Sequence, residues 1–309
     1  MSILIRRAIN MQSKSVSNSF SVDLFTGGNN TITNGLDLLN DGGMVWQKRR
    51  DAIGVNVLID TVNGNNRYLQ SNSTSGLTIF NNGITSFNND GYSMGSGYTG
   101  DFVSWSFKNA SKFFQVKTDV VQSGNWAINH SLGVQCGVMI VKRQASGGDW
   151  VVYHKDMPTN YTYLNTSGAQ QSSGTGNIVM NDTSVTTRSL FNAFVGQTCQ
   201  VLAFADDTSS NGVIRCGKYT GNGIIGNTIN LGWRPKFIII KGINNGTSWL
   251  MMDSERGGNK NLFSDRINAE STNIILSFND DGFSLINSQK SYNQSNFDYM
   301  YIAIRDISL

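Results

Sequence analysis

Few side chains in this sequence are candidates for catalysis or metal binding. Only two histidines occur, His130 and His154, so a histidine-based triad or a zinc site needing two or three histidines is not expected. Asp253 and Glu255 form an i, i+2 carboxylate pair, and glycan cleavage needs two carboxyl groups about 5–5.5 Å or 6.5–9.5 Å apart. Carboxylates at a strand end also accept turn hydrogen bonds, which is the interpretation favoured here.

Two acidic, glycine-containing stretches superficially resemble calcium loops. Asn88–Gly91 and Asp280–Gly282 lack the further acidic ligands that a calcium site needs, and an Asp-Gly pair is a strong hairpin signal. Nor does a glycine-rich segment follow a strand and open a helix, as phosphate-binding loops require. The sequence therefore predicts no metal, no cofactor and no enzymatic activity.

Polar side chains recur at fixed intervals along the chain. Lysines end one apolar run at Lys48, Lys142 and Lys241. Polar residues end the next apolar run at Asp60, His154 and Asp253. Both series advance by 94 and then 99 residues, which indicates an internal repeat of three units. A lysine at a strand end is expected to extend its charge to solvent.

The elements around these residues are predicted to be strands. Phe237–Ile240 and Trp249–Met252 are short runs of apolar residues joined by a polar, glycine-rich connection, as in a hairpin of buried strands. Trp249 is expected to lie buried between the sheets of the third unit. Ile84–Met94 and Ile275–Leu285 each contain Asp-Gly and predict matching hairpins in units 1 and 3. Thr183–Asn192 of unit 2 lacks Asp-Gly, so this unit is the divergent copy.

The predicted fold is all-β, with three tandem antiparallel β-sandwich repeats after a short N-terminal arm. The arm is 1–19, and the repeats are unit 1 (20–112), unit 2 (113–210) and unit 3 (211–309). A composition of 15% charged residues with 33 Gly and only 2 Pro is typical of a turn-rich β protein. Short joints at Lys108–Lys112 and Asp206–Asn211 favour a rod of packed units.

One order of motifs resembles a known family. It begins with an apolar strand that ends in lysine, Gly232–Lys241. After a turn come a strand that runs from Trp to Asp, within Trp249–Gly257, then Asp-Gly-Phe at Asp281–Phe283 and a Tyr-rich strand at Tyr299–Ile304. This order resembles a repeated lectin-like domain of unknown function in tail-associated virion proteins of marine and cyanobacterial phages. The resemblance covers nearly the whole chain after residue 20. It implies a concanavalin-like or jelly-roll sandwich, and no activity is established for that family.

The expected function is that of a phage virion protein, a tail fibre or receptor-binding component whose lectin-like units contact the host surface. The alternative is a capsid decoration or tail-sheathing protein that binds only other virion proteins, and a third, weaker hypothesis is a glycan depolymerase. Expected partners are other virion proteins and a host surface glycan, in a homo-oligomer held by lateral β-surface packing. The expected location is the virion, assembled in the bacterial host cytoplasm.

Two partner classes are not expected. A net charge of +3 is too small to indicate nucleic-acid binding. No apolar run approaches the roughly 18 residues of a membrane span, so membrane insertion is not expected.

Two sets of residues are candidates for contact with partners. The first is an attachment arm, formed by Ile3, Leu4, Ile5, Arg6, Arg7 and Ile9. The second consists of loops predicted to face outward, Asn165–Asn177 and Asn244–Ser248. Within them, the candidate binding residues are Asn165, Asn177, Asn244, Asn245 and Ser248.

Overall fold

A computed structural model describes residues 19–145, 147–174, 176–187, 189–273 and 275–307. The predicted all-β fold with three sandwich units is confirmed. Each unit pairs a six-stranded antiparallel sheet with a three-stranded one. Within the described residues, one short 3-10 helix, in unit 2, is the only helical element.

The three units repeat one order of elements. The strands of unit 1 are β1 (Phe20–Thr26), β2 (Asn30–Thr33), β3 (Gly43–Arg49), β4 (Asn56–Asp60), β5 (Arg67–Gln70), β6 (Thr78–Ile79), β7 (Ile84–Asn88), β8 (Gly91–Met94) and β9 (Asp101–Lys108). The elements of unit 2 are β10 (Phe114–Val120), β11 (Ala127–Asn129), β12 (Cys136–Arg143), β13 (Trp150–His154), β14 (Asn160–Tyr163), β15 (Gln171–Ser172), β16 (Val179–Met180), β17 (Ser184–Thr186), η1 (Ser189–Phe194) and β18 (Thr198–Ala205). The strands of unit 3 are β19 (Ile214–Thr220), β20 (Asn227–Asn230), β21 (Pro235–Gly242), β22 (Leu250–Asp253), β23 (Lys260–Phe263), β24 (Ser271–Thr272), β25 (Leu276–Asn279), β26 (Gly282–Leu285) and β27 (Asp298–Arg305).

Each unit closes on itself, because its first and last strands lie side by side. The large sheet of unit 1 has the order β1-β9-β3-β4-β5-β6, and its small sheet has the order β2-β8-β7. Units 2 and 3 repeat the large sheet as β10-β18-β12-β13-β14-β15 and β19-β27-β21-β22-β23-β24. Their small sheets are β11-β17-β16 and β20-β26-β25.

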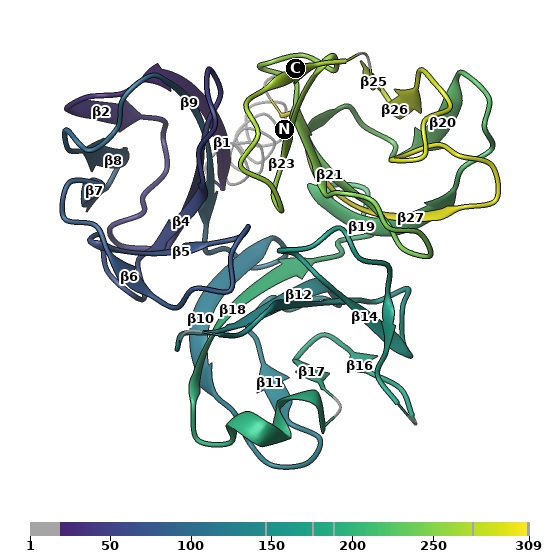
Figure 1. Cartoon of the computed structure of the whole chain (residues 1–309), viewed down its shortest axis with the longest axis horizontal. Helices are drawn as coiled ribbons and strands as arrows, with labels where there is room; N and C mark the ends of the chain where they lie inside the picture. The colour runs from purple at the N-terminus through teal and green to yellow at the C-terminus, as the bar shows by residue number, and fades with distance from the viewer. Residues whose placement is uncertain (1–18, 146, 175, 188, 274, 308–309) are drawn as a thin grey trace, which may run out of the picture.

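The units form a closed triangle, with unit 3 returning to contact unit 1 (Figure 1). The predicted rod is therefore wrong. Short joints are compatible with a rod or with this closed ring of three units. Contacts between residues far apart in the chain show that the units form the ring. One such contact is the ion pair between Arg50 of unit 1 and Glu270 of unit 3, at 3.0 Å.

The large sheets are buried on both faces, which explains their continuous apolar runs. In unit 3, Ile238 and Ile240 pack with Phe283 of the small sheet in a core of that unit alone. Phe237 and Ile239, which alternate with them, join a second core that contains residues of all three units. The sandwiches therefore share a hydrophobic centre in addition to the separate cores of units 1 and 3.

Phenylalanine rings from the three units meet in this centre. Phe107 of unit 1 lies 5.2 Å from Phe114 and 5.8 Å from Phe204 of unit 2, measured between ring centroids. The same ring lies 6.1 Å from Phe237 of unit 3. Because buried aromatic side chains carry large apolar areas, this cluster makes the folding of each unit depend on the others.

The two Asp-Gly hairpins are confirmed, with pairs Asn88↔Gly91 and Asn279↔Gly282 closing them. Glycine is required at Gly91 because a Cβ there would lie 1.9 Å from the carbonyl oxygen of Ile32 on β2. Unit 2 forms the same hairpin, β16–β17, without Asp-Gly. There the Asn181 side chain accepts the backbone N–H groups of the turn.

Candidate functional site

The repeated lysines do not reach solvent, so the expectation of solvent-exposed charges is wrong. Lys48, Lys142 and Lys241 are fully buried, and each donates to a backbone carbonyl of a neighbouring unit. The Nζ–O distances are 3.1 Å for Lys48 to Ile267, 3.2 Å for Lys142 to Thr74 and 2.7 Å for Lys241 to Gly168. The three contacts run from unit 1 to 3, from 2 to 1 and from 3 to 2, and so close the ring.

A second set of equivalent side chains strengthens the same junctions. Asn56, Trp150 and Trp249 occupy one repeat position and donate side-chain N–H groups to carbonyls of the adjacent unit. Trp249 Nε1 lies 2.9 Å from the Tyr163 carbonyl oxygen. Trp249 is buried as predicted, but it lies against unit 2 and not between the sheets of unit 3.

Burial lowers the pKa of all three lysines to about 8. The cause is desolvation, because an ammonium group loses hydration when it enters the protein interior. An amine with a lowered pKa can act as a base or nucleophile, but these amines are enclosed by loop carbonyls. Their position supports a structural role at the junctions.

The predicted outward-facing loops lie partly in the same junctions. Asn245 and Ser248 are buried, so their predicted exposure is wrong. The reason is that the β21–β22 connection packs on unit 2, where Gln170 N–H donates to the Ile243 carbonyl at 2.7 Å. Asn165 is half-buried and accepts the Trp150 N–H at 2.9 Å.

Asn177 and Asn244 are exposed, as predicted. Asn244 accepts the backbone N–H of Asp298. The arm residues Ile3, Leu4, Ile5, Arg6, Arg7 and Ile9 lie outside the described residues.

The two candidate catalytic carboxylates are separated by their partners. Asp253 is fully buried and accepts from Trp105 Nε1 at 3.0 Å and from Arg256 Nε at 2.6 Å. Glu255 instead pairs with Lys236 at 3.1 Å near the surface. Among the described residues, no group of three or more His, Cys, Asp or Glu could hold a metal ion.

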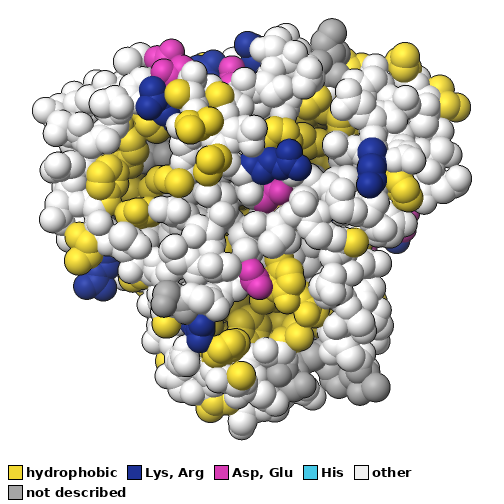
Figure 2. Space-filling view, in the orientation of Figure 1, with side chains coloured by type: hydrophobic (Ala, Val, Ile, Leu, Met, Phe, Trp, Pro, Cys, Tyr) yellow, Lys and Arg dark blue, Asp and Glu magenta, His cyan; other side chains and the backbone are white. Residues whose placement is uncertain are grey.

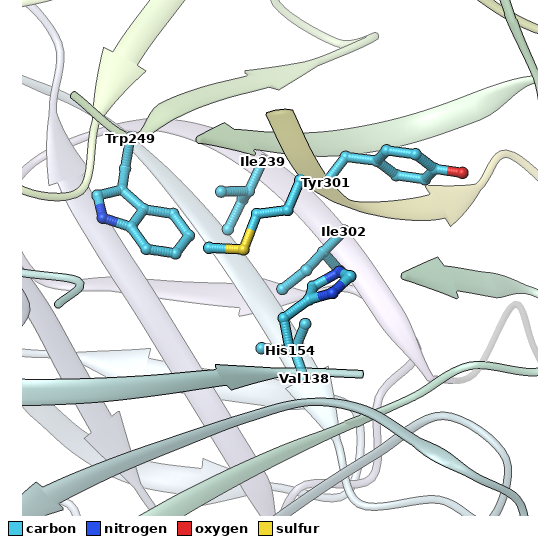
Figure 3. Close-up of a pocket in the computed structure, with 7 residues that line it drawn as sticks. Val138, His154, Ile239, Trp249, Tyr301 and Ile302 are labelled. Atoms are coloured by element: carbon cyan, nitrogen blue, oxygen red, sulfur yellow. The ribbon is translucent and has the colours of Figure 1, made fainter. Parts of the chain in front are cut away.

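His154 lies at the junction of units 2 and 3. Figure 3 shows it beside Ile302 of unit 3, and Ile239 and Trp249 of the same unit also line this cavity of about 10 Å³. Its Nδ1 accepts the Asp156 N–H at 3.1 Å, and burial lowers its pKa to about 4. A cavity of this size holds no more than one water molecule, so it is not a ligand site.

A larger cavity of about 260 Å³ opens in unit 1. Its aromatic wall is a chain of edge-on rings with centroids 5.2–5.9 Å apart, formed by Tyr68, Phe80, Tyr98 and Phe102. Ile53, Val55 and Val57 form the aliphatic side, and Ile53 is 70% exposed. Figure 2 shows hydrophobic side chains gathered in hollows of this kind on one face of the molecule.

Polar groups at this cavity are few. Arg49 lies at its edge and pairs with Asp51 at 2.8 Å. The remaining lining includes Gly54, Gly97 and Thr99, with no carboxylate or histidine among the lining residues. An apolar cavity with one cation at its edge suits an apolar or aromatic group.

Sequence reasoning missed this cavity because its lining comes from four separate stretches of unit 1. One local signal was present, since Ile53 and Val55 are bulky apolar residues in a hairpin connection. Among the described residues, no helix is long and apolar enough to cross a membrane.

A search of curated proteins returns no match. Residues 15–306, which include every strand of the ring, match as one block the model of the family described as "Domain of unknown function (DUF7483)", and the chain belongs to that family.

Proposed function

We propose that this chain is a non-enzymatic structural protein of a phage particle that binds another virion protein through the cavity of unit 1. The phage setting comes from the resemblance of its motifs to tail-associated virion proteins. The single observation that carries the binding role is the apolar cavity of about 260 Å³ with an exposed aliphatic edge.

The closed ring supports this role mechanically. Buried lysine contacts and a shared aromatic centre hold the three units in one arrangement, so the cavity is presented by a rigid body. A preorganised site loses little conformational entropy on binding. Exposed apolar surface of this kind is typical of protein interaction sites.

The chemistry of the cavity favours a protein partner over a sugar. Sugar recognition needs several hydrogen-bonding side chains beside an aromatic platform, whereas the charged group here, Arg49, is already paired with Asp51. The receptor-binding function therefore ranks second, and a glycan array on the purified protein tests it. Specific retention of one sugar would favour receptor binding.

The test of the proposed function is photo-cross-linking within assembled particles. A photoreactive amino acid replaces Ile53 at the edge of the cavity, and a control replaces Ile224 of unit 3, which is 66% exposed. We expect position 53, and not position 224, to cross-link to another virion protein. If the chain is missing from purified particles, or both positions cross-link alike, the proposal is wrong.

A further inference from the structure

The cavity of unit 1 is lined in part by a connecting segment that is shorter than its equivalents in units 2 and 3. Residues 95–100 join β8 to β9, which is six residues, whereas residues 286–297 join β26 to β27, which is twelve. In unit 2, residues 187–197 join β17 to β18, which is eleven. The lysine repeat makes these connections equivalent, so units 2 and 3 contain additional chain where unit 1 has a cavity.

Unit 2 fills the equivalent space with an aromatic ring under an arginine. Arg143 follows Lys142 as Arg49 follows Lys48, so the two arginines are equivalent. The Arg143 guanidinium carbon lies 4.2 Å from the centre of the Phe194 ring, which η1 supplies. Phe191 of the same helix contacts Trp126, with ring centroids 5.5 Å apart.

Unit 3 fills its equivalent space with a polar-anchored turn. The Tyr299 hydroxyl donates to the Lys290 carbonyl at 2.6 Å, and Asn245 Nδ2 approaches the same oxygen at 3.4 Å. The pairs Arg49↔Phe102 and Gly242↔Tyr299 make Phe102 the equivalent of Tyr299. Unit 1 therefore has an apolar ring that faces the cavity where unit 3 has the hydroxyl that anchors its own chain.

We propose that the unit 1 cavity receives an aromatic side chain from a segment of a partner protein, with its ring beneath Arg49. This rests on the proposed protein-binding role and specifies the partner's chemistry. The partner would supply the group that unit 2 supplies from its own chain as Phe194. A ring in this place would gain edge contacts with Phe80 and Phe102 and a cation–π contact with Arg49.

The test uses the whole purified protein and a capped peptide of residues 189–197, which carries Phe194 in its native context. Binding is measured by calorimetry and by chemical-shift changes at Phe80 and Phe102. The matched control peptide carries Phe194→Ala. The protein variants are Ile53→Asn at the cavity and Ile224→Asn as an equally exposed control, and both changes lie at the surface, where folding is not at risk.

We expect the Phe194 peptide to bind at least about tenfold more tightly than its alanine version. Ile53→Asn should weaken binding by a similar factor, and Ile224→Asn should not change it. No binding, equal binding of both peptides, or binding of toluene without binding of the peptide would overturn the inference. Since no particle is involved, failure here leaves the cross-linking result for the proposed function intact.

Discussion

Acidification should destabilise the three-unit ring through His154. The buried imidazole of this residue takes up a proton less readily than a solvent-exposed one. Apolar residues of unit 3 line the small cavity next to this imidazole, including Ile239, Trp249 and Ile302 (Figure 3). Burial is the main cause of the lowered pKa, opposed by Asp156, whose Oδ2 lies 3.9 Å from Nδ1. The nearby cations Lys155 and Lys218 lower the pKa further.

The sign and size follow from proton linkage. The folded-state pKa of about 4 is below the ordinary value of 6.5, so the unfolded chain takes up the proton first as the pH falls. The contribution of His154 to stability is therefore complete above pH 6.5 and is lost as the pH falls toward 4. Between pH 7 and pH 5 the loss is about 2 kcal/mol, and the whole shift is worth about 3 kcal/mol.

The matched variant is His154→Asn. Asparagine can accept the Asp156 N–H as Nδ1 does, and the equivalent Asp60 of unit 1 accepts the Val62 N–H with a side-chain oxygen in the same way. Urea unfolding followed by tryptophan fluorescence gives the free energy of unfolding at each pH. We expect the wild type to lose about 2 kcal/mol more than His154→Asn between pH 7 and pH 5. Parallel pH profiles of the two proteins would refute the reasoning, because all other titrating groups are shared.

Three further outcomes are expected. Trp249→Ala should lower the free energy of unfolding by about 3–5 kcal/mol in a single transition of the whole chain, measured in urea. Unit 3 alone, residues 211–309, should give no cooperative calorimetric transition. Without units 1 and 2, the face of its large sheet that contains Phe237 would be exposed to solvent. A sharp transition would contradict the shared core. Lys241→Met should speed hydrogen exchange in residues 164–170 and leave residues 71–77 unchanged, since Lys142 holds that second segment.

Local patterns were sufficient to predict the strands beside the repeated lysines and the Asp-Gly hairpins. The run at Phe237–Ile240, the Asp-Gly hairpins and the steps between the lysines are all features of neighbouring residues or of one repeat compared with another. The prediction of a rod was wrong because the same short joints also permit a ring. Only contacts such as that of Phe107 with Phe237 distinguish the two arrangements. A continuous apolar run was the available sign that both faces of the large sheet are covered.

The cavity of unit 1 was harder to predict because it depends on a connecting segment that is shorter than in the other units. The connection before β9 is five residues shorter than its equivalent in unit 2 and six shorter than that in unit 3, and this difference depends on where the closing strands of the repeats begin. The prediction that the loops face outward was wrong for Asn245 and Ser248 for a related reason. Asn245 and Ser248 are in a turn of polar composition, and such turns are usually exposed, but here the adjacent unit covers the turn.

The buried lysines show how three similar sheets can be fixed in one arrangement. Apolar packing alone is non-directional, so Phe107, Phe114 and Phe237 would tolerate small rotations of one unit against another. Each lysine instead requires particular carbonyls of the neighbouring loop, and leaving a buried donor unpaired costs about 1–3 kcal/mol. Rotation of one unit would break these contacts at both of its junctions. We infer that the lysines select one geometry of the ring, and the hydrogen exchange of residues 164–170 in Lys241→Met tests this, because an unchanged pattern would assign the selection to the aromatic centre alone.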